Sequence, residues 1–168
     1  MLDHGNMVWS RFQDLIADEP KMQWRMPDWF IKHKQDLIAR LPSMDIMEEY
    51  LTYHDCGKPS CRTVDEEGRQ HFPDHASASC KIWSTLGSPE AAKLMGMDMD
   101  IHLLKGDDIP DFIKKPECCA LLLAGFAEIH ANAEMFGGLE STGFKIKWKH
   151  IDKRGRAICK ALFEEVIE

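Results

Sequence analysis

The stretch Tyr53-His-Asp-Cys-Gly-Lys-Pro59 places an imidazole and a carboxylate on consecutive residues, His54 and Asp55. Apolar residues recur at helical spacing before this pair, and the glycine and proline after it stop a helix. The pair therefore falls at the end of a helix over about 44–56. Imidazole suits borderline metals such as Zn, Fe, Ni and Mn, while a carboxylate supplies charge and can bridge two ions. The stretch predicts a metal site at a helix end.

Helical periodicity runs through nearly the whole chain and predicts an all-α fold. The residues Trp9, Phe12, Leu15 and Ile16 show the spacing of one apolar helix face. Glycines and prolines mark where such segments stop. We expect helices over about 7–18, 27–41, 44–56, 73–86, 89–104, 108–114, 117–136 and 152–167.

Two stretches depart from the helical pattern. Residues 61–72 contain Gly68 between short polar arms, which predicts a small hairpin or ordered loop. The segment Phe144-Lys-Ile-Lys-Trp-Lys149 alternates strictly between apolar and basic residues. This alternation is typical of an extended segment with one apolar and one basic face.

The composition limits the class of protein. A chain of 168 residues is long enough for one compact domain, so we expect a single domain over 1–168. No apolar run approaches the roughly 20 residues of a membrane helix, and the start lacks a secretory pattern. The six cysteines form no Cys-x-x-Cys pair, which favours free thiols in a reducing cytoplasm. A net charge of −7 argues against a protein that coats DNA or RNA generally.

The His54–Asp55 pair followed by Cys-Gly-Lys-Pro resembles the defining pair of the HD phosphohydrolase superfamily. The segment Thr63–Phe72, with His75 after it, is similar to the HD domain of bacterial CCA-adding enzymes, in which a like loop ends in a histidine that opens the next helix. The resemblance covers most of the chain and implies an HD helical bundle. It also implies further metal ligands at His33, at His75 with His71 as second candidate, and at His102.

The closing aspartate of that family has no direct match in this chain. The best-matching helix, Leu121–Ala133, carries Glu128 where an Ala-Asp sequence is expected. Glu128 with its longer reach is the expected ligand, and Asp107 or Asp108 are alternatives. Asp98 and Asp100 either orient ligands or are solvated charges. His4, His130 and His150 receive no role.

Basic residues give candidate phosphate contacts. Lys58 follows the metal pair and either acts as a point charge on a phosphate or complements the helix dipole. His71 is a further candidate for substrate binding. The basic segment Lys145–Arg156, with Lys147 and Lys149 as the chosen residues, is either a phosphate-backbone contact or a solvated surface. Trp148 is a possible platform for base stacking.

The resemblance implies a metal-dependent phosphohydrolase, a phosphomonoesterase or phosphodiesterase, with one or two divalent ions among Mn, Fe, Ni, Co, Zn and Mg. Asp55 and Lys58 are the expected catalytic residues. The expected substrate is a nucleotide or an RNA end with a 2′,3′-cyclic or terminal phosphate. The alternatives are a free (deoxy)nucleotide phosphohydrolase and a non-catalytic protein that binds a nucleotide or signalling molecule on the HD fold. The sequence does not indicate an oligomeric state.

Overall fold

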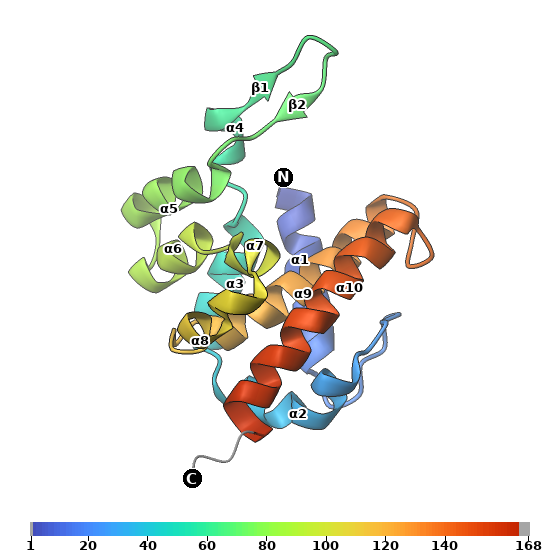
Figure 1. The fold of residues 1–168 in the computed structure, drawn as a ribbon. Coiled ribbons are helices and arrows are strands. Elements are labelled where there is room, and N and C mark those ends of the chain that lie inside the picture. The colour runs from blue at the N-terminus through green and yellow to red at the C-terminus, as the bar shows by residue number, and fades with distance from the viewer. Residues whose placement is uncertain (1, 165–168) are drawn as a thin grey trace. The chain divides into compact units, whose positions relative to one another are not determined.

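The computed structural model describes residues 2–164 and shows an all-α helical bundle with a small two-stranded sheet (Figure 1). The predicted fold class is confirmed. The chain divides into two compact units, and each is built from two separate stretches. Unit 1 comprises Met1–Trp9 and Ser43–Met99, and unit 2 comprises Ser10–Pro42 and Asp100–Glu168.

The elements follow one another along the chain with short connections. Unit 1 contains the first turns of α1 (Leu2–Ile16), then α3 (Met44–Tyr53), α4 (Lys58–Cys61), β1 (Thr63–Val64), β2 (Gln70–His71), α5 (His75–Leu86) and α6 (Pro89–Gly96). Unit 2 contains the rest of α1, then α2 (Asp28–Ala39), α7 (Asp100–Leu103), η1 (Gly106–Asp108), α8 (Ile109–Phe112), α9 (Cys118–Met135), α10 (Thr142–Cys159) and η2 (Lys160–Glu164).

Helix α6 is the centre of unit 1, because both α5 and α3 pack against it. Its start is fixed by Ser88, whose hydroxyl accepts a hydrogen bond from the Ala91 N–H, with proline at the first helical position. Glu49 on α3 accepts hydrogen bonds from the Trp83 indole N–H and the Ser88 N–H. These hydrogen bonds lower the pKa of Glu49, and the bond from the Ser88 N–H has the largest effect. The carboxylate therefore ties α3 to the turn between α5 and α6.

The predicted hairpin within 61–72 is confirmed. Strands β1 and β2 pair in antiparallel register, with Thr63 opposite His71 (Figure 1). Gly68 lies in the turn at φ +79°, a backbone conformation that residues other than glycine rarely adopt. Asp65 accepts hydrogen bonds from two backbone N–H groups of the turn, and its other oxygen lies 2.8 Å from His71 Nε2.

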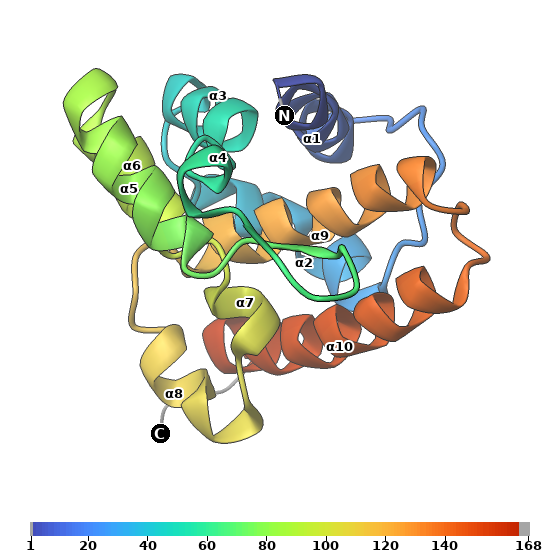
Figure 2. The ribbon, with the colours of Figure 1, turned by 90° about the horizontal axis from the view of Figure 1, so that it is seen from above.

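Helix α9 is the core of unit 2 and is buried along nearly its whole length. Helix α10 runs alongside α9 and also packs on α2 (Figure 2). Gly155 makes the second contact possible, since a Cβ there would lie 2.3 Å from the Trp29 ring. The buried residues Phe144, Ile151 and Ile158 form the inner face of α10, at a spacing of two helical turns.

His130 is a structural histidine inside unit 2. It is fully buried, and its Nδ1 lies 2.9 Å from the Phe126 carbonyl, which can only accept, so Nδ1 donates. Its Nε2 accepts the Arg25 N–H at 3.2 Å. Burial, more than any neighbouring charge, lowers its pKa to about 4. The ring is therefore neutral and satisfied near pH 7.

The prediction of an extended segment over Phe144–Lys149 is wrong, because these residues lie in α10. The helix begins where the Ser141 hydroxyl accepts the Phe144 N–H, ten residues before the predicted start at 152. Six residues that alternate between apolar and basic also fit a helix if later apolar residues follow at helical spacing. Ile151 and Ile158 follow Phe144 at that spacing. The part of the predicted helix beyond residue 164 lies outside the described residues.

Other helix boundaries also differ from the prediction, most of all at α1 and α6. Helix α1 begins at Leu2 rather than at 7, and the helix predicted over 89–104 is divided into α6 and α7 by a turn at Met97. No helix among residues 2–164 is long and apolar enough to cross a membrane. The six cysteines are free thiols, and Cys118, Cys119 and Cys159 are buried.

Candidate metal centre

The turn between α3 and α4 carries His54 and Asp55 and is held against α5. Gly57 allows this contact, because a Cβ at that position would lie 2.3 Å from the Ser79 backbone nitrogen. The Gly57 N–H also donates to the Ser79 hydroxyl at 2.9 Å. The glycine that marks the helix end in the sequence therefore fixes the position of the His-Asp pair within unit 1.

His54 is oriented as a metal ligand would be. It is buried, and its Nδ1 lies 2.7 Å from the Leu51 carbonyl oxygen. Because a carbonyl only accepts, Nδ1 carries the proton, and in the neutral ring Nε2 then carries the lone pair. Nε2 is 3.6 Å from Asp55 Oδ1. Metal-binding histidines commonly donate their other N–H to a backbone carbonyl in this way.

Asp55 has a buried carboxylate in which one oxygen lacks a hydrogen-bond partner. The residue is 6% exposed, and its Oδ2 lies 2.9 Å from the Lys58 ammonium. Its Oδ1 has no hydrogen-bond partner. A buried carboxylate oxygen without a partner is rare because its desolvation is costly, and a bound cation is one of the few ways to compensate it. The residues therefore fit a divalent ion.

His4 completes a group of three possible ligands. Its Nε2 lies 3.9 Å from Asp55 Oδ2, and its ring centroid is 5.5 Å from that of His54. One ligand atom from each of His4, His54 and Asp55 lies within 4.8 Å of the other two. Asp98, which is buried and accepts a hydrogen bond from the Tyr50 hydroxyl, is equally close to His54.

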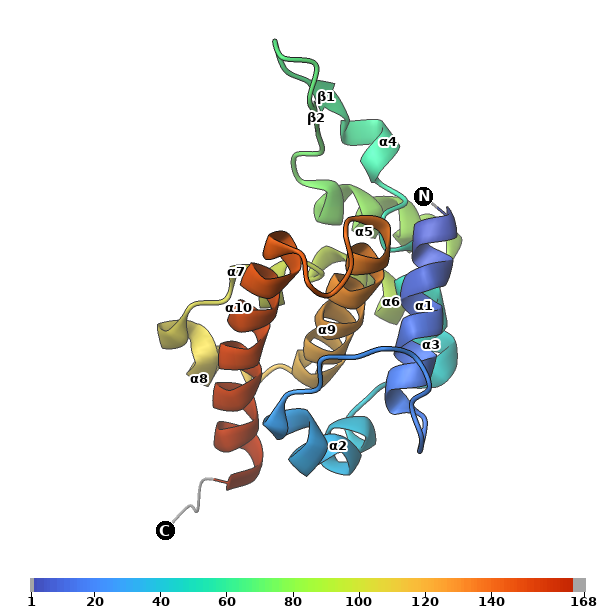
Figure 3. The same ribbon diagram turned by 90° about the vertical axis from the view of Figure 1, so that its right-hand side faces the viewer.

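Helix α1 lies beside α3 (Figures 2 and 3), and His4 belongs to its first turns. The contact depends on Gly5, where a Cβ would lie 1.8 Å from the Thr52 carbonyl oxygen. Sequence reasoning missed His4 because it placed the start of the first helix at 7. The sequence signal that could have indicated His4 is Gly5, a glycine directly after the histidine within α1.

The other predicted ligands are divided between the two units. His75 opens α5 in unit 1, with Nδ1 3.2 Å from the Phe72 carbonyl, and His71 is exposed on β2 beside Asp65. His102 and Glu128 both lie in unit 2, 3.7 Å apart. Gly125 allows α7 to approach α9 this closely, since a Cβ there would be 2.8 Å from Ile101 Cγ2. As metal ligands, these residues stay predictions.

His33 lies in unit 2 between two carboxylates. It is buried, with Nε2 3.1 Å from Glu164 and Nδ1 3.7 Å from Asp36. The two nitrogens of one imidazole point in different directions, so these two carboxylates cannot share one ion with the ring. Among residues 2–164, no group of three possible ligands includes His33. Its assignment as the first metal ligand is still a prediction.

A small hollow opens onto Asp55 inside unit 1. Its volume is about 120 Å³, and Leu2, Thr52, Tyr53 and Cys56 also line it. Tyr53 stacks on Trp83 with ring centroids 4.6 Å apart. Burial raises the pKa of the Cys56 thiol, so that side chain is not an activated nucleophile.

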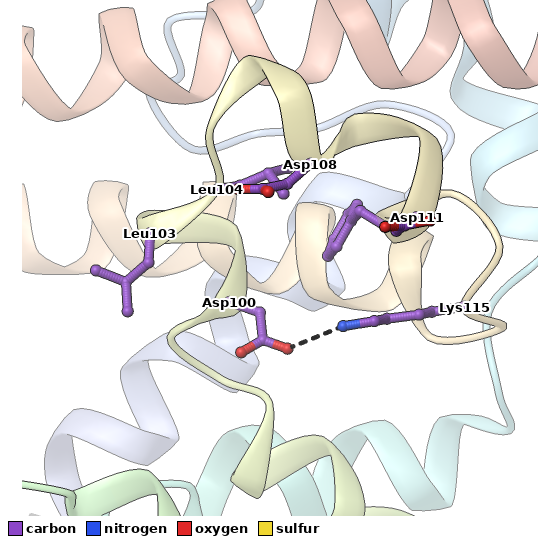
Figure 4. A pocket seen from close by; sticks show the side chains of 7 residues that line it. Asp100, Leu103, Leu104, Asp108, Asp111 and Lys115 are labelled. Carbon is purple, nitrogen blue, oxygen red and sulfur yellow. Dashed lines mark ion pairs between the residues drawn. The ribbon is translucent and has the colours of Figure 1, made fainter.

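A larger hollow, of about 310 Å³, lies in unit 2 around α7 and α8 (Figure 4). Asp100, Asp108 and Asp111 line it, and Asp100 forms an ion pair with Lys115 at 3.6 Å. Among the described residues, these carboxylates form no group of three within reach of one ion. Nothing in this hollow therefore supports Asp108 as the closing ligand.

Comparison of the chain with family models, with curated proteins and with solved structures finds no match. The resemblance to the HD superfamily therefore rests on the residues quoted from the sequence.

Proposed function

We propose that the protein is a metal-dependent phosphohydrolase whose divalent ion is bound by His4, His54 and Asp55, and whose substrate is a nucleotide or an RNA end bearing a phosphate. The observation that carries the proposal is the unsatisfied Oδ1 of buried Asp55, within 4.8 Å of two histidine nitrogens. Two imidazoles and a carboxylate leave open positions for water and substrate, as catalytic sites require.

Each residue of the centre has a distinct task. His54 presents Nε2 because Leu51 holds the proton on Nδ1. Asp55 contributes the negative charge that a divalent ion needs. A divalent ion held there would lower the pKa of bound water and polarise a phosphoryl oxygen. The ion could be Mn, Fe, Ni, Co, Zn or Mg, since histidine and carboxylate together serve all of them.

Lys58 is the residue best suited to contact the substrate phosphate. Its side chain is about one-third exposed while its ammonium touches Asp55, so it reaches both solvent and the centre. An ammonium acts as a point charge on phosphate oxygens and stabilises the charge that develops in the transition state.

The test combines metal content with turnover. We would strip the protein with a chelator, reload it with each divalent ion, and measure bound metal by mass spectrometry. Hydrolysis would be followed on bis-p-nitrophenyl phosphate, on nucleoside monophosphates and on RNA ending in a 2′,3′-cyclic phosphate. His54→Ala and Asp55→Ala should each lose metal and turnover while keeping helical circular dichroism. His150→Ala is the matched control, because that histidine lies in unit 2 and has no role in the centre.

The outcomes separate two functions and also test whether the metal centre exists. Metal binding with turnover that both variants lose supports the phosphohydrolase. Metal or nucleotide binding without turnover of any substrate would instead identify a non-catalytic binding protein. A wild-type protein that retains no divalent ion under any condition would overturn the proposed centre.

A further inference from the structure

The hairpin of β1 and β2 connects Lys58 to Phe72 within unit 1. Lys58 opens α4, which precedes β1, and Phe72 directly follows β2 (Figures 1 and 3). Each strand has two residues, and a hairpin of this size is marginally stable by itself in water. The antiparallel pairing of Thr63 with His71 returns the chain to the end of α4. The hairpin therefore brings Phe72 back to the helix that carries Lys58.

The backbone of Phe72 is fixed on both sides. Before it, the register of the two strands sets its position. After it, the Phe72 carbonyl oxygen lies 3.2 Å from His75 Nδ1, which donates because a carbonyl only accepts. Asp74 has φ +53°, a left-handed conformation that persists in a residue with a side chain where the surrounding structure holds it. Phe72 is thus held between the hairpin and the start of α5.

The Phe72 ring faces the Lys58 ammonium. Lys58 Nζ lies 5.5 Å from the ring centroid, within the range of about 6 Å for a cation–π interaction. The same Nζ is 2.9 Å from Asp55 Oδ2. Phe72 is half-buried, and the Lys58 side chain is 30% exposed, so water covers this contact only in part. The ammonium therefore has a carboxylate and an aromatic face as neighbours.

These two neighbours hold the ammonium in different ways. The Asp55 carboxylate accepts a hydrogen bond from Lys58. The Phe72 ring attracts the positive charge through its quadrupole and offers no lone pair. Because an ammonium has three N–H donors, the donors that Asp55 does not use stay available for phosphate oxygens. A second carboxylate in place of the ring would take up a donor and would repel the phosphate.

We infer that Phe72 is a positioning residue, whose ring holds the Lys58 ammonium beside Asp55 for contact with the substrate phosphate. This inference rests on the proposed function, and it gives the hairpin a task in the same site. The simpler alternative is that Phe72 only covers the aliphatic part of Lys58, for which any apolar side chain of similar size would serve. The electrostatic character of the ring separates the two, so leucine and tyrosine at position 72 should behave differently.

A double-mutant cycle tests the inference. Steady-state kinetics on bis-p-nitrophenyl phosphate would compare wild type, Phe72→Leu, Lys58→Gln and the double variant, each loaded with the same divalent ion. Phe72→Leu should lower kcat about two- to fivefold, as expected for one partly exposed cation–π contact, and should leave KM and bound metal unchanged. In the Lys58→Gln background the same change should have no further effect. Phe72→Tyr retains an aromatic face and should keep the kcat of wild type.

A second measurement needs no substitution of Phe72. The ring should shift the NMR resonance of the Lys58 ε-methylene group in wild type, and Lys58→Gln would assign that resonance. Val64→Thr is the control, because Val64 lies on β1 of the same hairpin and is 55% exposed. It should match wild type in both measurements.

The outcomes distinguish this inference from the proposed function. An equal fall of kcat in both backgrounds, a Phe72→Tyr variant as slow as Phe72→Leu, or an unshifted Lys58 resonance would overturn the role of Phe72 and leave the phosphohydrolase standing. A wild-type protein that hydrolyses no phosphoester would instead overturn the proposed function, and the role of Phe72 with it.

Discussion

Lys58 and a bound divalent ion would both interact with the Asp55 carboxylate, the ammonium at Oδ2 and the ion at Oδ1. The Lys58 ammonium lies 2.9 Å from Oδ2, at the side of the carboxylate that also faces His4. Lys58→Gln removes this neighbouring cation, and we expect metal affinity to rise several-fold. The same change removes the point charge for phosphate, so kcat should fall at least tenfold. Isothermal titration with Mn²⁺ and steady-state kinetics would show the two opposite effects. Lys81→Gln, on α5, is the control for loss of one charge.

His4 and His33 make a decisive pair of substitutions. His4 lies in the ligand group of unit 1, while His33 faces Asp36 and Glu164 in unit 2. His4→Ala should reduce bound metal as strongly as His54→Ala does, because it removes one of three direct ligands. His33→Ala should leave the metal content unchanged. Metal retained by the His4 variant but lost from the His33 variant would restore the assignment made from the sequence.

At the scale of elements, the close approach of α1 to α3 should control metal binding at the proposed centre. It does so through Gly5, which is not itself a metal ligand. A Cβ at Gly5 would meet the Thr52 carbonyl oxygen at 1.8 Å, so Gly5→Ala must move one helix away from the other. We expect a loss of about 1–3 kcal/mol in the free energy of unfolding and at least tenfold weaker metal binding. Denaturant titration and metal titration would measure both.

Gly143→Ala provides the control for this substitution. Gly143 also lies inside a helix, and a Cβ there would meet nothing within 4 Å. This variant should gain up to about 1 kcal/mol from helix propensity and keep its metal. If Gly5→Ala behaves like Gly143→Ala, the two helices do not approach as closely as described.

The elements also show where sequence reasoning succeeds. The end of α3 at the His54–Asp55 pair and the hairpin turn at Gly68 were predictable because glycine and proline act locally. His4 was not, since its position follows from a contact between residues about fifty apart in sequence. The alternation in Phe144–Lys149 led to a wrong prediction of an extended segment. A window of six residues is too short to distinguish a strand period of 2 residues from the helical period, which Ile151 and Ile158 continue.

At the scale of the whole molecule, His130 should make stability depend on pH. Its pKa in the folded protein is about 4, below the ordinary 6.5, because burial disfavours the charged ring. Between these values the unfolded chain binds more protons than the folded one, so the free energy of unfolding falls as pH falls through that range. From this residue we expect a loss of about 2 kcal/mol between pH 7.5 and 5. Urea denaturation at the two pH values would measure it.

The variant His130→Gln isolates this contribution. Glutamine does not titrate, so the difference between the two pH values should shrink by about 2 kcal/mol relative to wild type. The variant will be less stable at pH 7.5, because the hydrogen bonds to Arg25 and Phe126 change. An equal pH dependence in both proteins would show that His130 does not titrate between these pH values.

The interleaved chain path of the two units also bears on synthesis. His4 leaves the ribosome long before His54 and Asp55, and the stretch that completes unit 1 ends only at Met99. At roughly 5–20 residues per second, the nascent chain must grow for several seconds before the first histidine can meet its partners. During that time the chain that becomes the first part of unit 2, Ser10–Pro42, has already emerged. Binding of a metal ion by His4, His54 and Asp55 would therefore be a late event in synthesis, because it requires translation at least as far as Met99.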